Sequence, residues 1–147
     1  MLSEEEQGML KRGVEAVDNG DTRTGMFCLE DLFEKKPDPL ITSYYAVCLA
    51  KERGEVKRAF ELCDEARDDD PGNPVHYLNL GRVYLAAGMK REAIKVFRDG
   101  LLYRKYPLIS RELDRLGWRR PPVLPALRRE HPLNRILGRM FCKLSLR

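Results

Sequence analysis

Two histidines, four cysteines and a run of three aspartates are the first side chains of this 147-residue chain to consider for catalysis or metal binding. His76 and His131 are the only imidazoles, and neither stands beside a serine or cysteine in a recognisable nucleophile motif. The run Asp68–Asp70 offers metal-binding oxygens, but successive helical residues point in different directions, so a solvated helix end before Pro71 is expected. No glycine-rich loop matches a phosphate-binding pattern. The sequence therefore predicts a protein that is not an enzyme and that holds no cofactor or metal.

The cysteines do not form a metal-binding pattern either. They contain no Cys-x-x-Cys pair and match no zinc-ligand spacing, and their positions are Cys28, Cys48, Cys63 and Cys142. Cys28 and Cys63 fall on helical stretches where small apolar side chains pack, so we expect buried, reduced thiols. The N-terminus is acidic, unlike a secretory signal, and no apolar run approaches the ~20 residues of a membrane span. These features predict a cytoplasmic location.

Charge is divided unevenly along the chain. Residues 1–110 hold 17 Lys and Arg against 20 Asp and Glu, a net charge of −3, whereas residues 111–147 hold 10 against 3, a net charge of +7. Such an asymmetry indicates a basic tail of a different kind from the rest of the chain. Nucleic-acid binding is disfavoured because Trp118 and Phe141 are the only aromatic residues available to stack on bases in this tail.

A 34-residue interval organises the rest of the chain. Residues 77–97 carry Tyr-x-x-Leu-Gly-x-x-Tyr, then a turn glycine, then Ala-x-x-x-Phe. The turn glycine recurs at the same interval as Gly20, Gly54 and Gly88. A small residue, where two helices must approach closely, recurs as Gly25, Ala59 and Ala93. The spacing predicts three copies of one helix–turn–helix unit, over residues 6–39, 40–73 and 74–107.

Helix start and stop signals agree with this interval. Ser3 and Glu6 form a capping box, which starts a helix near residue 4, and the turn at 19–21 ends it. Further breaks occur at 37–39 and 70–74, where proline stands beside Asp, Gly or Asn. The expected helices cover residues 22–36, 40–53, 55–69, 74–87 and 89–104. No stretch alternates as a strand would, so the sequence predicts an all-α fold.

On these motifs the chain resembles the tetratricopeptide repeat family over residues 6–107, with a capping helix at 108–117, so that the repeat domain would be residues 1–117. The resemblance implies a right-handed α-solenoid whose first helices line a concave groove for a peptide or helix of a partner protein. The implied groove residues are Leu10, Lys11, Val14, Tyr44, Tyr45, Cys48, Lys51, Leu78, Asn79 and Arg82. Asn79 and Arg82 are expected on an exposed helix face. For Tyr44 and Tyr45, packing between repeats is equally open.

One subfamily grips the acidic C-termini of heat-shock chaperones with a clamp of lysines, asparagines and an arginine. The matching positions here hold no cationic side chain, since they are Leu10, Val14, Tyr45, Val75 and Asn79. The chain is therefore expected not to bind chaperone tails.

The tail, residues 118–147, contains two further patterns. Residues 119–125 are proline-rich and have the spacing Arg-x-x-Pro-x-x-Pro, which is expected to be an extended connection or a ligand for an aromatic groove. Residues 132–146 place one apolar stripe on a helix, formed by Leu133, Ile136, Leu137, Met140, Phe141 and Leu144. Three uses of this helix are open: packing on the repeats, self-association, or contact with an anionic membrane.

The sequence as a whole predicts a non-catalytic adaptor that binds a protein segment. Two other functions remain open: attachment to an anionic surface through the basic tail, and a role resembling the small three-repeat chaperones that hold secreted bacterial proteins before export.

Overall fold

The structure is a computed structural model that describes residues 2–117 and 131–143. It divides into two compact units, Met1–Leu116 and Gly117–Arg147. The proline-rich segment 119–125 and the last residues of the predicted tail helix, 144–146, lie outside the described residues. Every regular element in the described ranges is a helix, which confirms the predicted all-α fold.

The first unit contains seven α-helices and one π-helical turn in chain order. They are α1 (Glu4–Asp18), α2 (Thr22–Lys35), α3 (Pro39–Cys48), the π-helical turn η1 (Leu49–Arg53), α4 (Val56–Asp69), α5 (Pro74–Ala86), α6 (Lys90–Tyr103) and α7 (Pro107–Arg115). The α-helices of the repeats begin and end within one residue of the positions that the sequence signals predicted, apart from η1. The pattern gave one helix over 40–53, whereas the structure widens its last five residues into η1.

The helix ends show why these boundaries fall where they do. Ser3 accepts a hydrogen bond from the Glu6 amide and Glu6 reaches back to the Ser3 amide, so the predicted capping box is present. Asp21, Asp38 and Asn73 each accept a backbone amide hydrogen bond at the start of their helices. The turns after α1, η1 and α5 contain glycines with positive φ, which other residues rarely adopt: Gly20 at 91°, Gly54 at 70° and Gly88 at 75°.

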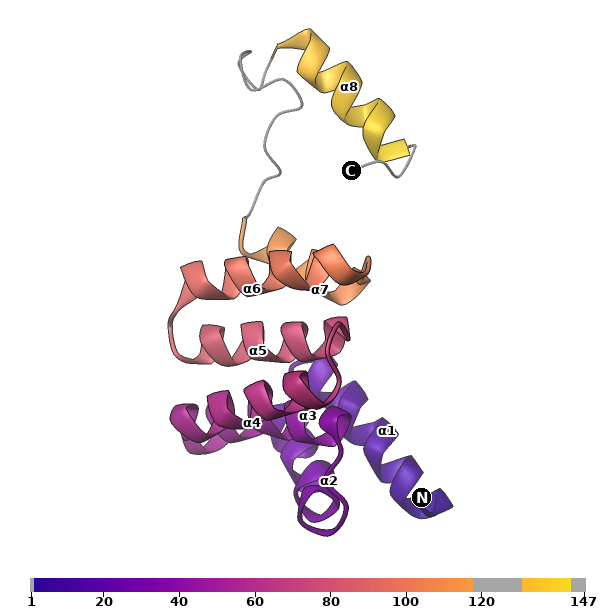
Figure 1. The fold of residues 1–147 in the computed structure, drawn as a ribbon, viewed down its shortest axis with the longest axis vertical. Helices are drawn as coiled ribbons and strands as arrows, with labels where there is room; N and C mark the ends of the chain where they lie inside the picture. Colours follow the sequence, from indigo (N-terminus) through magenta and orange to yellow (C-terminus); the bar gives the residue numbers. More distant parts are fainter. Residues whose placement is uncertain (1, 118–130, 144–147) are drawn as a thin grey trace. The chain divides into compact units, whose positions relative to one another are not determined.

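The helices stack as an α-solenoid (Figure 1). Helices pair within each repeat as α1 with α2, α3 with α4 and α5 with α6, and neighbouring pairs pack through α2 with α3 and α4 with α5. The first helices of successive repeats also touch, α1 with α3 and α3 with α5, and α7 packs on α6. The predicted solenoid of helical repeats is confirmed, and it places the first helices in one layer, from which the candidate site is built.

Close approach within the helix pairs depends on small residues at the contacts. An added Cβ on Gly81 would lie 2.1 Å from the Phe97 ring, so α5 and α6 can meet at this distance only with glycine there. Ala59 and Ala93, at the 34-residue interval, are fully buried, as are Cys63 and Phe97 one turn later. The repeated sequence positions are therefore the positions that form the core.

Three of the cysteines lie in this core as free thiols: Cys28, Cys48 and Cys63. The expectation of buried, reduced thiols at Cys28 and Cys63 is confirmed. Burial raises the pKa of the Cys48 thiol to about 12 and also raises the pKa of Cys63. Cys48 and Cys63 are consequently core residues whose thiols stay protonated at neutral pH.

The second unit contains one described helix, α8 (Pro132–Lys143). Leu133, Ile136 and Met140 recur at helical spacing, and each is about half exposed, at 49%, 55% and 52%. Arg135 and Arg139 are also exposed. Within the described ranges, none of the helices has the length and apolar character needed to cross a membrane.

Candidate functional site

A pocket of about 570 Å³ opens among the first helices of the repeats and α7. Its walls come from the end of α1 and the following turn, from η1, from α5 and from α7. The lining residues are Val17, Asp18, Asn19, Gly20, Lys51, Arg82, Leu85, Arg111, Glu112 and Arg115. Of these elements, α1, η1 and α5 lie on the first helices that the family resemblance assigns to the groove, whereas α7 corresponds to the predicted capping helix. The pocket that they enclose is the candidate binding site.

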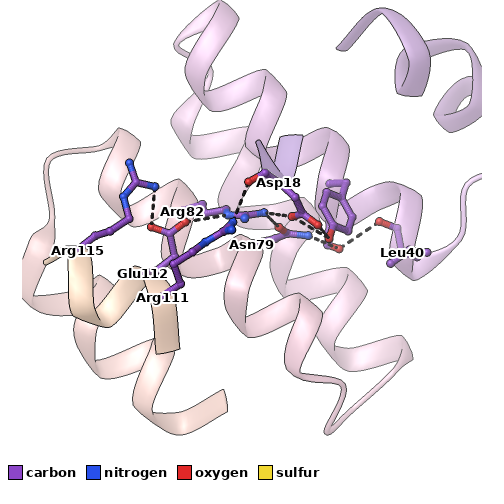
Figure 2. A network of polar contacts seen from close by, with 9 residues as sticks. Asp18, Leu40, Asn79, Arg82, Arg111, Glu112 and Arg115 are labelled. Atoms are coloured by element: carbon purple, nitrogen blue, oxygen red, sulfur yellow. Dashed lines mark hydrogen bonds and ion pairs between the residues drawn. The ribbon is translucent and has the colours of Figure 1, made fainter. Parts of the chain in front are cut away.

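Arg82 is the most buried charged residue of the pocket. Only 5% of its side chain is exposed, and its guanidinium lies between a carboxylate of α1 and a carboxylate of α7 (Figure 2). Arg82 Nη1 lies 2.7 Å from Asp18 Oδ1, and Arg82 Nε lies 3.8 Å from Glu112 Oε1. Arg82 Nη1 also donates to Asn79 Oδ1 at 3.2 Å. The guanidinium thus has two carboxylate partners and fixes the pocket floor.

The mouth of the pocket is more open and more cationic. Arg111 is exposed and its Nη2 donates to the backbone carbonyl of Asp18 at 3.1 Å. Arg115, 71% exposed, lies 3.5 Å from Glu112. Lys51 is exposed on η1, and within the described ranges its ammonium has no hydrogen-bond or ion-pair partner. The wider π-helical turn therefore carries an unpaired cation at the edge of the pocket.

A buried polar network lies beneath the pocket. Ser43 Oγ on α3 accepts a hydrogen bond from Asn79 Nδ2 at 3.1 Å and donates to the Leu40 carbonyl at 3.2 Å. The Tyr44 hydroxyl lies 3.2 Å from both Asp18 carboxylate oxygens. Within the described part of the chain, no buried side-chain nitrogen or oxygen lacks a hydrogen-bond partner. Such a satisfied network fixes α1, α3 and α5 relative to one another.

His76 joins this network in an arrangement that the sequence did not reveal. Its Nδ1 lies 3.1 Å from Ser43 Oγ and its Nε2 lies 3.2 Å from Asp70 Oδ2. The order Ser–His–Asp matches that of a catalytic triad. However, Ser43 and His76 are both fully buried, so a substrate has no access to the hydroxyl. Burial lowers the pKa of His76, although the Asp70 carboxylate opposes this shift. The arrangement can therefore hold helices together, but it cannot attack a substrate.

The structure distributes the ten predicted groove residues over three environments. Six are buried, namely Tyr44, Tyr45, Cys48, Leu78, Asn79 and Arg82. Leu10 and Val14 are partly buried against the core, and Lys11 and Lys51 are exposed. The expected exposed position of Asn79 and Arg82 is wrong, because Asn79 hydrogen-bonds to α3 and Arg82 to α1. Of the ten residues, the pocket brings together Lys51 and Arg82.

Tyr45 illustrates the packing alternative. Its ring stacks on Phe33 of α2, with ring centroids 4.6 Å apart, and its hydroxyl lies 3.4 Å from Glu30 Oε1. Both partners belong to the preceding repeat, so Tyr45 packs between repeats.

Four charged lining residues were missed by sequence reasoning: Asp18, Arg111, Glu112 and Arg115. The capping helix was expected only to cover the end of the third repeat. Its charged residues at 111, 112 and 115 are spaced at i, i+1 and i+4, which was a sign that one face of this helix is polar.

Comparisons with known proteins agree with the fold. A family model described as "Tetratricopeptide repeat" matches residues 50–105. The chain is 31% identical over 77 residues to the TPR repeat-containing protein YpiA of Bacillus subtilis (strain 168), an alignment that covers 52% of this chain and 18% of the relative. The chain thus spans less than a fifth of that relative.

Solved structures of such domains share its architecture. The TPR domain of Sgt2 from Aspergillus fumigatus superposes with a TM-score of 0.57 at 16% identity, covering 78% of each chain. The first TPR domain of the human RPAP3 protein gives 0.55 at 16% identity, covering 76% of this chain and 89% of that domain. The Arabidopsis OM64 TPR domain gives 0.54 at 18% identity, covering 77% and 94%. At these identities the likeness shows the fold.

Proposed function

Because residues 50–105 match the tetratricopeptide repeat model and solved TPR domains share the fold, we propose that the chain is a non-catalytic adaptor of this family that binds a segment of a partner protein between the first helices of its repeats and α7. Proteins of this fold generally serve protein–protein interaction. The observation that carries the proposal is the pocket of about 570 Å³, which is lined by α1, η1, α5 and α7. Its size is that of an ordinary ligand-binding cleft and suits a few side chains of a peptide.

The burial of six predicted groove residues narrows the proposed binding surface. A ligand would contact the pocket mouth, where Lys51, Arg111 and Arg115 are exposed and Leu85 is half-buried. The buried Asn79 and Arg82 would instead act as the support of that surface. We also propose that the binding surface extends along α1 to Leu10, Lys11 and Val14. The scaffold is already folded before binding, which lowers the ordering cost of the complex.

The experiment that tests this function blocks the pocket without changing its charge. Leu85→Trp places a large ring in the mouth, and Phe27→Trp serves as control because Phe27 is 78% exposed on α2 and does not line the pocket. Tagged wild type and both variants, matched by circular dichroism, would be used for quantitative pull-downs from native lysate. Partners that are lost from Leu85→Trp and kept by Phe27→Trp support the proposal. Identical partners for all three proteins contradict it. We propose a cytoplasmic location for this binding, which fractionation of the same lysate tests.

Heat-shock chaperone tails are not the proposed partner. The positions of the two-carboxylate clamp hold Leu10, Val14, Tyr45, Val75 and Asn79, which carry no positive charge, and Tyr45 and Asn79 are in addition buried. We predict no detectable binding of a Glu-Glu-Val-Asp peptide in titration calorimetry. Micromolar affinity for this peptide would show that the prediction is wrong.

One observation favours a second candidate function, attachment to an anionic membrane surface through α8. Leu133, Ile136 and Met140 are about half exposed, and the exposed cations Arg135 and Arg139 lie on the same short helix. Helices of this composition bind in the headgroup region of anionic membranes. Co-sedimentation with vesicles containing phosphatidylserine, but not with phosphatidylcholine vesicles, would support this candidate if Ile136→Asp abolished it. Equal sedimentation of the wild type and Ile136→Asp with phosphatidylserine vesicles would exclude membrane attachment through α8.

A further inference from the structure

We infer that the pocket selects partner segments that carry acidic side chains, with Lys51 and Arg111 as the residues that contact the carboxylates. The inference rests on the proposed function, since it names the class of segment that the adaptor binds. It is carried by an imbalance of charge within the pocket and by the positions of the two cations that cause it.

The pocket contains more positive than negative charge. Its lining includes four cationic side chains, Lys51, Arg82, Arg111 and Arg115, and two carboxylates, Asp18 and Glu112. The difference is a net charge of +2. The repeats as a whole have the opposite sign, because residues 1–110 hold 17 Lys and Arg against 20 Asp and Glu. Positive charge is thus concentrated in this pocket, where the surrounding protein strengthens its field.

The contacts show which cations are available to a ligand. Arg82 is 5% exposed and its guanidinium already faces both carboxylates, Asp18 at 2.7 Å and Glu112 at 3.8 Å. Arg115 lies 3.5 Å from Glu112, so its charge is also partly compensated. The two carboxylates are therefore engaged by Arg82 and Arg115, and the excess charge remains on the other two cations.

Lys51 and Arg111 meet the requirements for ligand contact. Both are exposed, and they stand on different elements, η1 and α7, at the edge of one pocket. In the described structure Arg111 donates to the backbone carbonyl of Asp18. This carbonyl accepts a hydrogen bond but does not neutralise the charge of the guanidinium. Lys51 has no hydrogen-bond or ion-pair partner in the same ranges. Two cations that face one opening suit a segment with two or more Asp or Glu residues.

The arrangement differs from the clamp for chaperone C-termini. The clamp positions hold no cation, whereas Lys51 lies on the π-helical turn and Arg111 on the capping helix. The inferred ligand is consequently an acidic segment within a partner chain, whose side-chain carboxylates are recognised.

The test selects random twelve-residue peptides, fused at their C-termini to a phage coat protein so that no free carboxyl terminus is offered. Selection would use the full chain as wild type, as Lys51→Glu/Arg111→Glu, and as Leu85→Trp. The control is Lys57→Glu/Lys95→Glu, which makes the same change in net charge at exposed sites on α4 and α6 outside the pocket. The best peptide would then be titrated by fluorescence anisotropy at two salt concentrations.

The expected result is enrichment of Asp and Glu by the wild type and by the control, and loss of this enrichment with Lys51→Glu/Arg111→Glu. The affinity of the selected peptide should fall roughly tenfold or more in that variant and should weaken with salt. Peptides without acidic enrichment that still depend on Leu85 would overturn the inference and leave the proposed function standing. No peptide selected by any form of the protein would contradict both.

Discussion

At the scale of single residues, Ser43 is the point on which the buried polar groups converge. Its hydroxyl meets Asn79, His76 and the Leu40 carbonyl, all within 3.2 Å. These partners come from two repeats, so the serine joins α3 to α5 through hydrogen bonds rather than through apolar contact alone. A buried network of this kind is stable only while each member keeps its hydrogen-bonding form. The protonation state of His76 therefore matters for stability.

We predict that unfolding becomes easier on mild acidification because of His76. Burial lowers its pKa in the folded state below the ordinary value of 6.5, although Asp70 and Asp38 partly oppose the shift. Below about pH 6.5 the unfolded chain takes up a proton that the folded chain does not, so the free energy of unfolding falls. The fall reaches at most about 1.4 kcal/mol per pH unit for one proton. Urea denaturation at pH 7.5 and pH 5.5 measures it.

The contribution of His76 is isolated by comparing variants. His76→Gln should lose stability at pH 7.5 but show a smaller fall between the two pH values than the wild type. The chain has two histidines, and the exposed His131 provides the control. The variant His131→Gln should show the same fall in the free energy of unfolding between pH 7.5 and pH 5.5 as the wild type. Asp70 affects stability in a different pH range. Hydrogen bonds from Asn73 and His76 lower its pKa from 3.8, so its contribution to the free energy of unfolding is lost only as the pH falls below that value. An NMR midpoint for His76 above 6.5 would refute this account.

At the scale of the helices, two glycines with opposite surroundings provide a matched test. An added Cβ at Gly81 would meet the Phe97 ring at 2.1 Å, whereas Gly8, on the exposed face of α1, has nothing within 4 Å of such an atom. Gly81→Ala should destabilise the protein by about 1–3 kcal/mol through overpacking of α5 against α6. Gly8→Ala should stabilise it by about 0.5–1 kcal/mol, because alanine is the better helix former. Urea midpoints of both variants give the two values.

The packing explanation for Gly81 is tested by a double-mutant cycle. Phe97→Leu removes the ring that the new methyl group would meet, so the double variant Gly81→Ala/Phe97→Leu should be more stable than the sum of the single effects predicts. Additive effects would mean that Gly81 acts through something other than its distance to Phe97.

The helices were largely predictable from sequence because their signals are local. The Ser3–Glu6 capping box, the turn glycines and the prolines at the starts of α3 and α5 act within a few residues of themselves. The small residues at the 34-residue interval also indicated which helices pair. η1 was missed because the apolar pattern of residues 40–53 does not distinguish a π-helical turn from an α-helix.

The site was less predictable because its contacts join distant parts of the chain. Spacing placed Arg82 correctly on the first helix of its repeat, but its burial depends on Asp18, 64 residues earlier, and on Glu112 in α7. The burial of Asn79 likewise depends on Ser43, 36 residues earlier. A repeat pattern specifies neighbours along the solenoid, and it does not say how closely its curvature brings α1 to α7.

At the scale of the whole first unit, Met1–Leu116, the Asp18–Arg82–Glu112 network joins α1 to α7 through α5. We predict that Asp18→Asn destabilises the unit, because it removes the charge 2.7 Å from the nearly buried Arg82. Breaking one side of a buried pair typically costs about 3–5 kcal/mol, and the remaining contact with Glu112 should keep the loss below that range. Hydrogen exchange should quicken at the end of α1 and in α7, with less change in α4.

The control for this variant is Asp114→Asn, which removes a carboxylate from the exposed face of α7. It should leave both the stability and the exchange pattern unchanged. A uniform rise in exchange in Asp18→Asn, equal in α4 and α7, would instead indicate a general loss of stability rather than release of the network.

The hydrogen bond from Arg111 to the Asp18 carbonyl, across 93 residues, also limits how this chain can change in length. Solenoids usually gain or lose whole repeats during evolution, since each repeat needs only its neighbours. Here an additional 34-residue unit between α6 and α7 would carry Arg111 and Glu112 away from Asp18 and leave the buried Arg82 without one of its two carboxylates. The contacts of Arg82 with Asp18 and Glu112 therefore favour three repeats in this chain. Duplication of a repeat would require compensating substitutions at these charged positions.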